Sequence, residues 1–396
     1  MKVKNFLKGK GGVYSFMAGA LVVLLLLAGL PACAPAVEVE EAAYEKYVSS
    51  LPEGCEPVPR ECFEQAIEEG QINIYDWAEW WPEEIYSGFS EAFGIKITRD
   101  VFGDIDEALT KFKLSPEIGY DYTLPEPRVF MQMKELDLLQ KINWHWLPNV
   151  NEYLADMYRE ADMYESGCPY GVPSEANFMG IAYNPKFIDP SDPRMGSWAL
   201  ILEGEEYAGR MTMMNDMYNV IGNALQYLGY SYSSDDEEEL GEARDLLLRQ
   251  KPWVMSYDSW PKRPILEEEA WMAQMWTGDA LYIKDDFPTL EIVIPEEGSL
   301  LVLVSLVIPK GSTHPAAAHC WINYLYRPQV YAALMEAIKY TPCNTAAVEF
   351  LPEEIRELPT VQIPEEVSEK CESIQPKAFT GKGLELRSEI WEELKR

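Results

Sequence analysis

From residue 71 onward, short runs of β-branched and aromatic residues alternate with amphipathic stretches of helical period. The first such pair is a predicted strand over residues 72–75 and a predicted helix that opens at Pro82. In this helix Ile85, Phe89 and Phe93 share one face, and Gly94 follows as a typical helix stop. Alternation of this kind predicts α/β units around largely parallel sheets.

The same alternation continues to residue 338. Further strands are expected at 95–97, 120–124, 211–214, 276–283 and 300–308, and further helices at 105–114, 129–142, 220–228, 315–326 and 328–338. The apolar run at 300–308 is typical of a strand that is buried on both faces. Because the region after residue 70 is too long for one ordinary α/β core, we expect two domains.

The N-terminus has the order of an export signal. Four lysines precede an uncharged apolar run from Val13 to Leu30, which ends in Leu30-Pro31-Ala32-Cys33. A short apolar core that ends in small residues and a cysteine predicts a lipoprotein signal peptide over residues 1–32, with Cys33 as the lipidated first mature residue. An uncleaved transmembrane anchor is the alternative, because the run is just long enough to span a bilayer.

Export places the rest of the chain outside the cytoplasm, in the periplasm or on the cell surface, held to the membrane by its N-terminal lipid. The formal net charge is −33, and removal of residues 1–32 with their four lysines makes it −37. Such a surface excludes nucleic acid as a partner. It suits a cationic ligand, but a surface charge this large is more often an adaptation to solubility or habitat, so the charge alone does not select the ligand.

Residues 33–70 are acidic and contain several prolines, which predicts a tether ahead of the folded body. Six cysteines follow Cys33 in an oxidising compartment, so up to three disulfides are possible. Only the nearness of Cys55 and Cys62 favours a particular pair. Cys320 lies in a helical pattern and could instead be a buried thiol.

The sequence lacks the usual signs of catalysis. It has no nucleotide-binding glycine loop, no zinc motif and no Gly-flanked nucleophilic serine. Its three histidines, His145, His314 and His319, have no metal-binding spacing. We therefore expect no cofactor, no metal and no enzymatic activity.

An aromatic and acidic cluster, Tyr75-Asp76-Trp77-Ala78-Glu79-Trp80-Trp81-Pro82, follows the first predicted strand. Ligands of open α/β sheets bind beyond the carboxyl ends of strands. Indole rings attract ammonium groups through their quadrupole, and a carboxylate pairs with the charge. Trp77 and Glu79 are the better candidates, because Trp81 could be a core residue.

Together with Phe93-Gly94-Ile95-Lys96, this cluster resembles the opening of the bacterial periplasmic spermidine/putrescine-binding proteins, solute receptors of ABC importers. Further matching stretches include Tyr170-Gly171-Val172-Pro173, Gly180-Ile181-Ala182-Tyr183-Asn184, Trp276-Thr277-Gly278, Ser305-Leu306-Val307-Ile308-Pro309 and Asn323-Tyr324-Leu325-Tyr326-Arg327-Pro328. The resemblance covers about residues 71–396, and the order of the matches is more specific than any one of them.

The resemblance implies a two-lobed α/β fold of the periplasmic-binding-protein type (type II), with the ligand clamped between lobes that are joined by crossing strands. Lobe one would comprise residues 71–180 and 304–349, and lobe two residues 181–303 and 350–396. The implied ligand residues are Trp77, Glu79, Trp80, Asp216, Trp276 and Tyr340, and the protein would act as a monomer together with the importer's permease subunits.

Several positions depart from the family pattern. Ala78 replaces a hydroxyl residue, Asn219 stands where a second acid is common, and Glu126 and Arg128 occupy a segment that usually offers Ser and Tyr. Val302 and Val304 replace a tryptophan and an amine-binding aspartate, which weakens the case for a polyamine. Arg128 could favour an anion if it points inward, or it could form a partly exposed ion pair.

We therefore expect a lipid-anchored receptor for a small organic cation, with a polyamine first among the ligands. A thiamine-like or betaine-like compound and a zwitterionic amino compound are the next alternatives. In a different class, two of Glu79, Asp216 and Glu126 could serve a carbohydrate-active hydrolase, with tryptophans stacking on sugars. A receptor-shaped protein that has become a sensor or adhesin is the third possibility.

Overall fold

The computed structural model describes residues 36–396 except residues 79, 162–163, 165–166, 359 and 362. Contacts divide the chain into two units, Met1–Ala42 and Ala43–Arg396. The predicted signal peptide and Cys33 lie outside the described residues. Within the described part, none of the helices is both long and apolar enough to span a bilayer.

The strands are β1 (Gln71–Trp77), β2 (Lys96–Phe102), β3 (Val172–Tyr183), β4 (Met211–Met213), β5 (Val254–Tyr257), β6 (Met272–Trp276), β7 (Glu291–Val293), β8 (Leu301–Leu306) and β9 (Thr341–Pro342). The first nine helices are α1 (Ala36–Ser49), α2 (Arg60–Glu69), α3 (Glu83–Phe93), α4 (Ile105–Leu114), α5 (Pro127–Glu135), α6 (Pro148–Tyr153), α7 (Asp156–Arg159), α8 (Ala199–Leu202) and α9 (Met217–Tyr227).

The later helices are α10 (Glu237–Gln250), α11 (Lys262–Leu266), α12 (Thr277–Asp286), α13 (Pro315–Leu325), α14 (Pro328–Ile338), α15 (Glu353–Arg356), α16 (Glu365–Ser368), α17 (Pro376–Phe379) and α18 (Gly381–Lys395). Short 3-10 helices are η1 (Trp144–Trp146), η2 (Glu205–Tyr207), η3 (Lys251–Trp253) and η4 (Ala346–Phe350).

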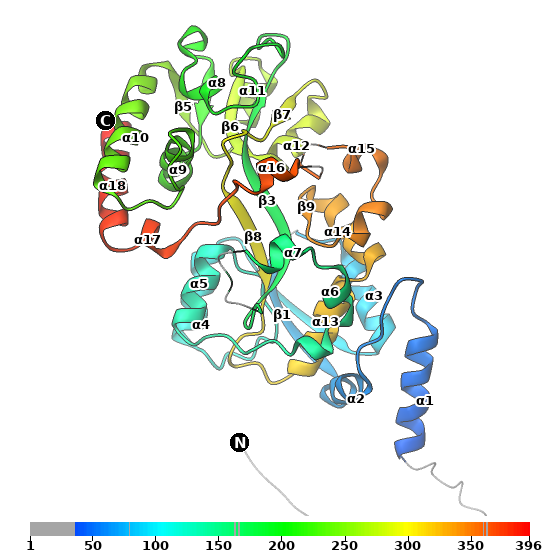
Figure 1. The fold of residues 1–396 in the computed structure, drawn as a ribbon. Helices are drawn as coiled ribbons and strands as arrows, with labels where there is room; N and C mark the ends of the chain where they lie inside the picture. Colours follow the sequence, from blue (N-terminus) through cyan, green and yellow to red (C-terminus); the bar gives the residue numbers. More distant parts are fainter. Residues whose placement is uncertain (1–35, 79, 162–163, 165–166, 359, 362) are drawn as a thin grey trace, which may run out of the picture. The chain divides into compact units, whose positions relative to one another are not determined.

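Strand β3 connects the two groups of elements seen in Figure 1. Its first half pairs antiparallel with β8 and β9, and its second half pairs antiparallel with β6 and β7. All twelve of its residues are buried. Because β3 pairs with strands of both sheet regions, it links the two regions directly. β8 runs beside the first half of β3.

The parallel pairs match the sequence expectation. β1 pairs parallel with β2 from Gln71 to Trp77, and β4 pairs parallel with both β5 and β6. The carboxyl ends of β1, β4 and β6 are followed by Ala78, Met214 and Thr277 respectively. These three strand ends supply most of the site described below.

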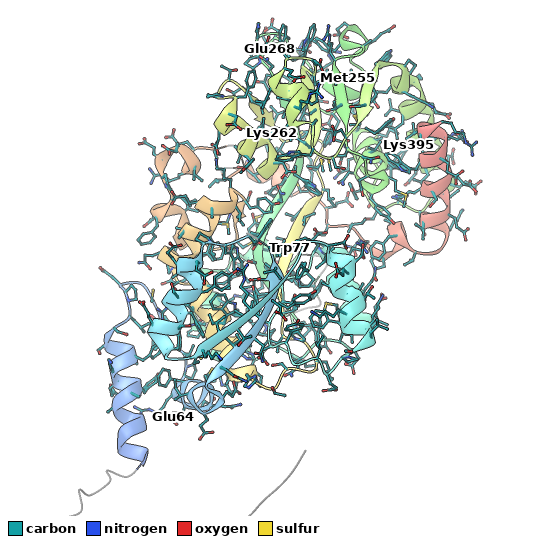
Figure 2. All side chains as sticks on the ribbon, turned by 180° about the vertical axis from the view of Figure 1, so that it is seen from behind. Glu64, Trp77, Met255, Lys262, Glu268 and Lys395 are labelled. Atoms are coloured by element: carbon teal, nitrogen blue, oxygen red, sulfur yellow. The ribbon has the colours of Figure 1, made fainter. Side chains whose placement is uncertain are left out.

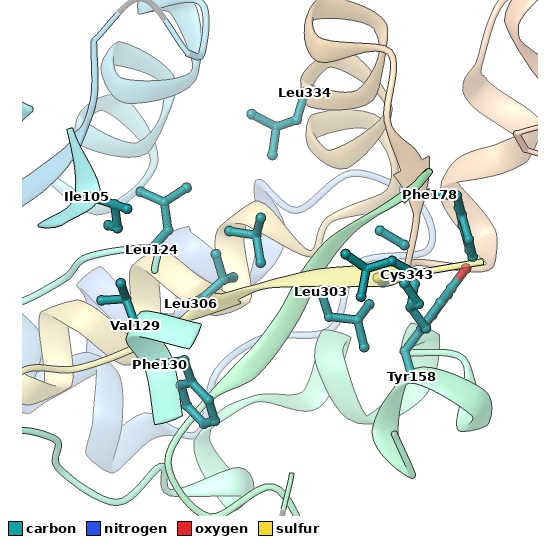
Figure 3. Packing of buried hydrophobic residues seen from close by; sticks show 14 of the residues in the cluster. Ile105, Leu124, Val129, Phe130, Tyr158, Phe178, Leu303, Leu306, Leu334 and Cys343 are labelled. Carbon is teal, nitrogen blue, oxygen red and sulfur yellow. The ribbon is translucent and has the colours of Figure 1, made fainter. Parts of the chain in front are cut away.

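The hydrophobic core is continuous through both groups of elements. Around β3 and β8 the buried side chain of Leu306 lies near Val129 of α5, whereas those of Leu303 and Phe178 lie toward Tyr158 of α7 (Figure 3). The expectation that residues 300–308 form a strand buried on both faces is confirmed, because five of the six residues of β8 are buried.

Two predicted elements end or begin in a different place. The helix expected over 129–142 ends at Glu135, because Asp137 adopts a left-handed conformation (φ 52°) and Leu139 bridges to Pro309. The strand expected over 276–283 is wrong. β6 ends at Trp276, and Asn177 Oδ1 accepts hydrogen bonds from the Thr277 hydroxyl and the Gly278 amide, which hold the start of α12.

The strand expected at 120–124 is present only as single bridges. Tyr122 bridges to Ile74 and Thr123 bridges to Val307, so the segment still links β1 to the chain that follows β8. Pro125 ends the extended stretch because it has no amide hydrogen to donate. The segment is nevertheless fully buried from Tyr120 to Leu124.

The prediction that residues 33–70 form a tether is corrected, because much of this segment packs into the folded body. Tyr47, Val58, Phe63 and Ala66 are buried, and Tyr47 stacks on Phe63 with ring centroids 4.9 Å apart. The compact unit therefore begins at Ala43 rather than after residue 70. The lobe boundaries expected from the sequence stay a prediction.

The expected Cys55–Cys62 disulfide is not formed, and all six described cysteines are free thiols. Cys55 Sγ lies 3.6 Å from Gln329 Oε1, whereas Cys62 Sγ lies 3.7 Å from Cys320 Sγ. The chain enters α2 just before Cys62, and this turn directs the Cys62 thiol into the contact between α2 and α13.

Candidate functional site

A cavity of about 480 Å³ is built at the ends of β1, β4 and β6, beside β3 and β8. Its volume lies in the range of small-molecule sites. The lining residues are Trp77, Trp80, Glu126, Asn177, Met214, Asn215, Asp216, Asn219, Ser259, Trp276, Asp279, Val302, Val304 and Tyr340. Both predicted lobes contribute to this set.

Three aromatic side chains form one wall of the cavity. Trp77 is the last residue of β1 (Figure 2), and its ring centroid lies 6.1 Å from that of Trp80. Trp80 meets Tyr340 edge to face at 5.5 Å. The backbone of Trp77 is fixed by its parallel pairing with Phe102, and their rings are 4.7 Å apart. This wall therefore sits on an ordered strand end.

Trp276 comes from a different sheet region, at the carboxyl end of β6, where it pairs with Met179 of β3. It is half-buried, as are Trp77, Trp80 and Tyr340. A half-buried ring in a cavity keeps a face open to a ligand. By contrast, Trp81 is a core residue: it is 5% exposed and packs near Trp321.

Three carboxylates line the cavity: Glu126, Asp216 and Asp279. Burial raises the pKa of each above its usual value, and that of Asp279 to about 6. Among the described residues that line the cavity there is no Lys, Arg or His. The cavity therefore holds acidic groups that lack a counter-charge within it, which favours a cationic guest.

Asp216 also has a structural role, since it is the N-cap of α9. Its Oδ1 accepts hydrogen bonds from the backbone amide of Asn219 at 2.9 Å and from Asn219 Nδ2 at 3.0 Å. Asn219 is itself buried and accepts a hydrogen bond from Tyr232. The cap fixes the direction of the Asp216 carboxylate beside the cavity.

Arg128, the one basic candidate from the sequence, lies outside the lining of the cavity. Its two terminal nitrogens donate to the two carboxylate oxygens of Asp106, both at 2.9 Å. This bidentate ion pair raises the pKa of Arg128 and lowers that of Asp106. The structure thus places Arg128 in the partly exposed ion pair, and the interpretation as an anion-binding residue is corrected.

Glu175 lies directly behind the aromatic wall. It is fully buried on β3, and its Oε1 accepts a hydrogen bond from Trp80 Nε1 at 3.3 Å. Burial raises the pKa of Glu175 to about 7. This carboxylate orients the Trp80 ring from behind without lining the cavity itself.

The structure brings most of the sequence candidates together. Those that line the cavity are Trp77, Trp80, Glu126, Asp216, Asn219, Trp276 and Tyr340. Glu79 lies outside the described residues. Sequence reasoning missed Asn177 and Asp279, although Asp279 stands three residues after Trp276, one helical turn away, and this spacing was a usable signal.

The described residues give no support for metal chemistry. No group of three or more His, Cys, Asp and Glu side chains is placed to hold a metal ion within this part of the chain. His314 pairs with Asp121, with Nδ1 and Oδ2 2.9 Å apart, and His319 is buried against the Asn143 amide.

Comparison with known proteins decides the family. The sequence-family model of the bacterial extracellular solute-binding proteins matches residues 84–363 of this chain. The chain belongs to this family. It is 27% identical over 291 residues to the spermidine/putrescine-binding periplasmic protein of Escherichia coli, covering 73% of this chain and 82% of the relative.

Solved structures show the same fold for this solute-binding protein. The spermidine/putrescine ABC transporter substrate-binding protein of Streptococcus pneumoniae aligns with a TM-score of 0.77 at 24% identity, covering 82% of this chain and 98% of the other. A lipoprotein of Treponema pallidum aligns with a TM-score of 0.68 at 24% identity, covering 82% and 99%. The two-lobed α/β fold expected from the sequence is confirmed.

Proposed function

We propose that this protein is the extracytoplasmic receptor of an ABC importer and that its cavity binds a linear polyamine. The observation that carries the proposal is the composition of the cavity: three carboxylates and four aromatic rings, with no basic residue among its described lining residues. Relatives whose names state spermidine or putrescine binding support the same ligand class.

The aromatic rings and the carboxylates would recognise different parts of such a ligand. Trp77 and Trp276 offer ring faces to ammonium groups and methylene segments. Asp216 offers a charge partner whose raised pKa falls when a cation arrives, because the charged form then gains a partner. Val302 and Val304, which stand where the family has a tryptophan and an aspartate, would contact methylene groups.

Binding without chemical change fits this set of residues. The receptor would present the bound polyamine to permease subunits and release it unaltered. We also propose that the N-terminal lipid holds the receptor at the membrane, an arrangement supported by the lipoprotein among the similar structures. Mass spectrometry of spermidine recovered after long incubation with the protein should show the compound unchanged.

The proposal is tested by calorimetric titration of putrescine, spermidine, thiamine, glycine betaine and γ-aminobutyrate. Putrescine or spermidine should bind most tightly. Trp77→Ala or Trp276→Ala should cost about 1–3 kcal/mol of binding free energy through lost ring and apolar contact. Asp216→Asn should cost about 2–5 kcal/mol, because an ammonium group loses its counter-charge.

Asp236→Asn is the matched control for Asp216→Asn. Asp236 is the N-cap of α10, accepts hydrogen bonds from Glu238 and Glu239, and is exposed away from the cavity. Asparagine keeps both caps, so only the charge changes. Equal polyamine affinity for the two variants would place Asp216 outside the site, and binding of thiamine or glycine betaine alone would reject the polyamine.

A further inference from the structure

A second cavity of about 340 Å³ adjoins the first. Its lining residues are Trp80, Trp260, Gly278, Asp279, Tyr282, Ala337, Ile338 and Tyr340. Three of these residues, Trp80, Asp279 and Tyr340, also line the first cavity. The two cavities therefore meet at one set of side chains, with a single carboxylate among the residues they share.

Asp279 is placed to interact with a guest rather than with the protein. It lies in the first turn of α12, but its side chain does not cap the helix. The structure gives it neither a hydrogen bond nor an ion pair with another described residue, and it is half-buried. An acid in this position is favourable for the helix dipole, yet that role does not require it to line two cavities.

The outer end of the second cavity is aromatic. Trp260 and Tyr282 are 44% and 56% exposed, and their ring centroids are 6.0 Å apart. Lys262 Nζ lies over the Tyr282 ring at 5.0 Å, and Asp286 neutralises it with an ion pair at 2.7 Å. The Tyr282 ring thus already forms a cation–π contact with an ammonium group of the protein, that of Lys262.

We infer that the second cavity is a distal subsite for long polyamines, in which Asp279 binds an inner ammonium group and Trp260 with Tyr282 contact the outer amine end. This inference rests on the proposed function and adds a length preference to it. A diamine would bind within the first cavity, whereas a triamine or tetraamine would continue past Asp279 into the second. Asp279, which lines both cavities, would thereby replace the amine-binding aspartate that the family has at the position of Val304.

The test is calorimetric titration of putrescine, spermidine and spermine against wild type, Asp279→Asn and the double variant Trp260→Ala with Tyr282→Ala. The double variant should weaken spermine binding about tenfold and leave putrescine within about twofold, because only the longer chain reaches the exposed rings. Asp279→Asn should weaken spermidine and spermine about 30-fold through loss of the counter-charge.

Phe350→Ala is the control for truncation of an exposed ring, since Phe350 is 50% exposed and lines neither cavity. If the double variant weakens putrescine and spermine equally, or neither, the distal subsite is rejected. If wild type binds no polyamine, the proposed function fails instead. Retained putrescine binding that depends on Asp216, with no gain for spermine, rejects only the distal subsite.

Discussion

Glu175 is the buried acid whose protonation should be visible in the stability of the protein. Its Oε2 has no hydrogen-bond partner among the described residues, and burial raises its pKa from 4.5 to about 7. The folded state therefore binds this proton more tightly than the unfolded state does. The stability contribution is retained below pH 4.5 and is lost as the pH rises toward 7 and beyond.

We expect the free energy of unfolding of wild type to fall more than that of Glu175→Gln between pH 5 and pH 8, by about 2–3 kcal/mol. Glutamine keeps an acceptor for Trp80 and carries no charge. Urea denaturation at both pH values measures the difference. Glu117→Gln, at an exposed position, should follow wild type. Parallel curves for wild type and Glu175→Gln would show that Glu175 does not titrate in this range.

Individual site residues were predictable where two signals coincided. Trp77 combines an aromatic ring with a predicted strand end, whereas Trp276 and Asp216 were implied by the family resemblance, and the structure places them at the end of β6 and after β4. Asp279 was missed because its segment was interpreted as a strand, which hid its place one helical turn after Trp276. The partner of Arg128 was open until the structure placed Asp106 opposite it, since residues on α4 and α5 meet only through tertiary packing.

At the scale of elements, the contact between α12 and the chain after α14 shapes the junction of the two cavities. Gly278, in the first turn of α12, has room for no side chain, because an added Cβ would lie 2.2 Å from Tyr340 Cε1. Gly278→Ala should therefore displace the Tyr340 ring from its position in the cavity wall, and it should weaken polyamine binding by about 1–3 kcal/mol.

Calorimetry on Gly278→Ala measures this effect, and Gly241→Ala provides the comparison. Gly241 lies within α10 with nothing within 4 Å of an added Cβ. Alanine there should leave binding unchanged and stabilise the helix by up to about 1 kcal/mol. Unchanged polyamine affinity in Gly278→Ala would mean that the Tyr340 ring does not contact the ligand.

Elements with a strong period were predictable to within a few residues. α3, α4, α13 and α14 lie where the apolar spacing and the flanking Pro or Gly residues placed them. The sequence misled where one apolar run serves two elements: Met275 and Trp276 belong to β6, whereas Leu281 and Ile283 face the core from α12. Only the hydrogen bonds from Thr277 and Gly278 to Asn177 reveal that the period changes there.

At the scale of the whole molecule, the proposed N-terminal lipid would hold the receptor at the membrane, near its importer. Cys33 precedes the start of the compact unit at Ala43 by only ten residues. A lipid on Cys33 would therefore join the compact unit to the membrane through a short stretch of chain. The strongly acidic surface offers no attraction to anionic headgroups, so the lipid would supply the membrane affinity.

Cys33→Ala should consequently move the protein out of the membrane-anchored fraction, because attachment of the acyl chains requires the Cys33 thiol and stable anchoring needs at least two membrane signals. Cell fractionation with antibody detection measures the distribution, and mass spectrometry of wild type should show a modified Cys33 as the first residue. Cys55→Ser, which removes a half-buried free thiol, should leave the wild-type distribution unchanged. Wild type that retains residues 1–32, together with Cys33→Ala that stays in the membrane fraction, would instead establish the apolar run from Val13 to Leu30 as a transmembrane anchor.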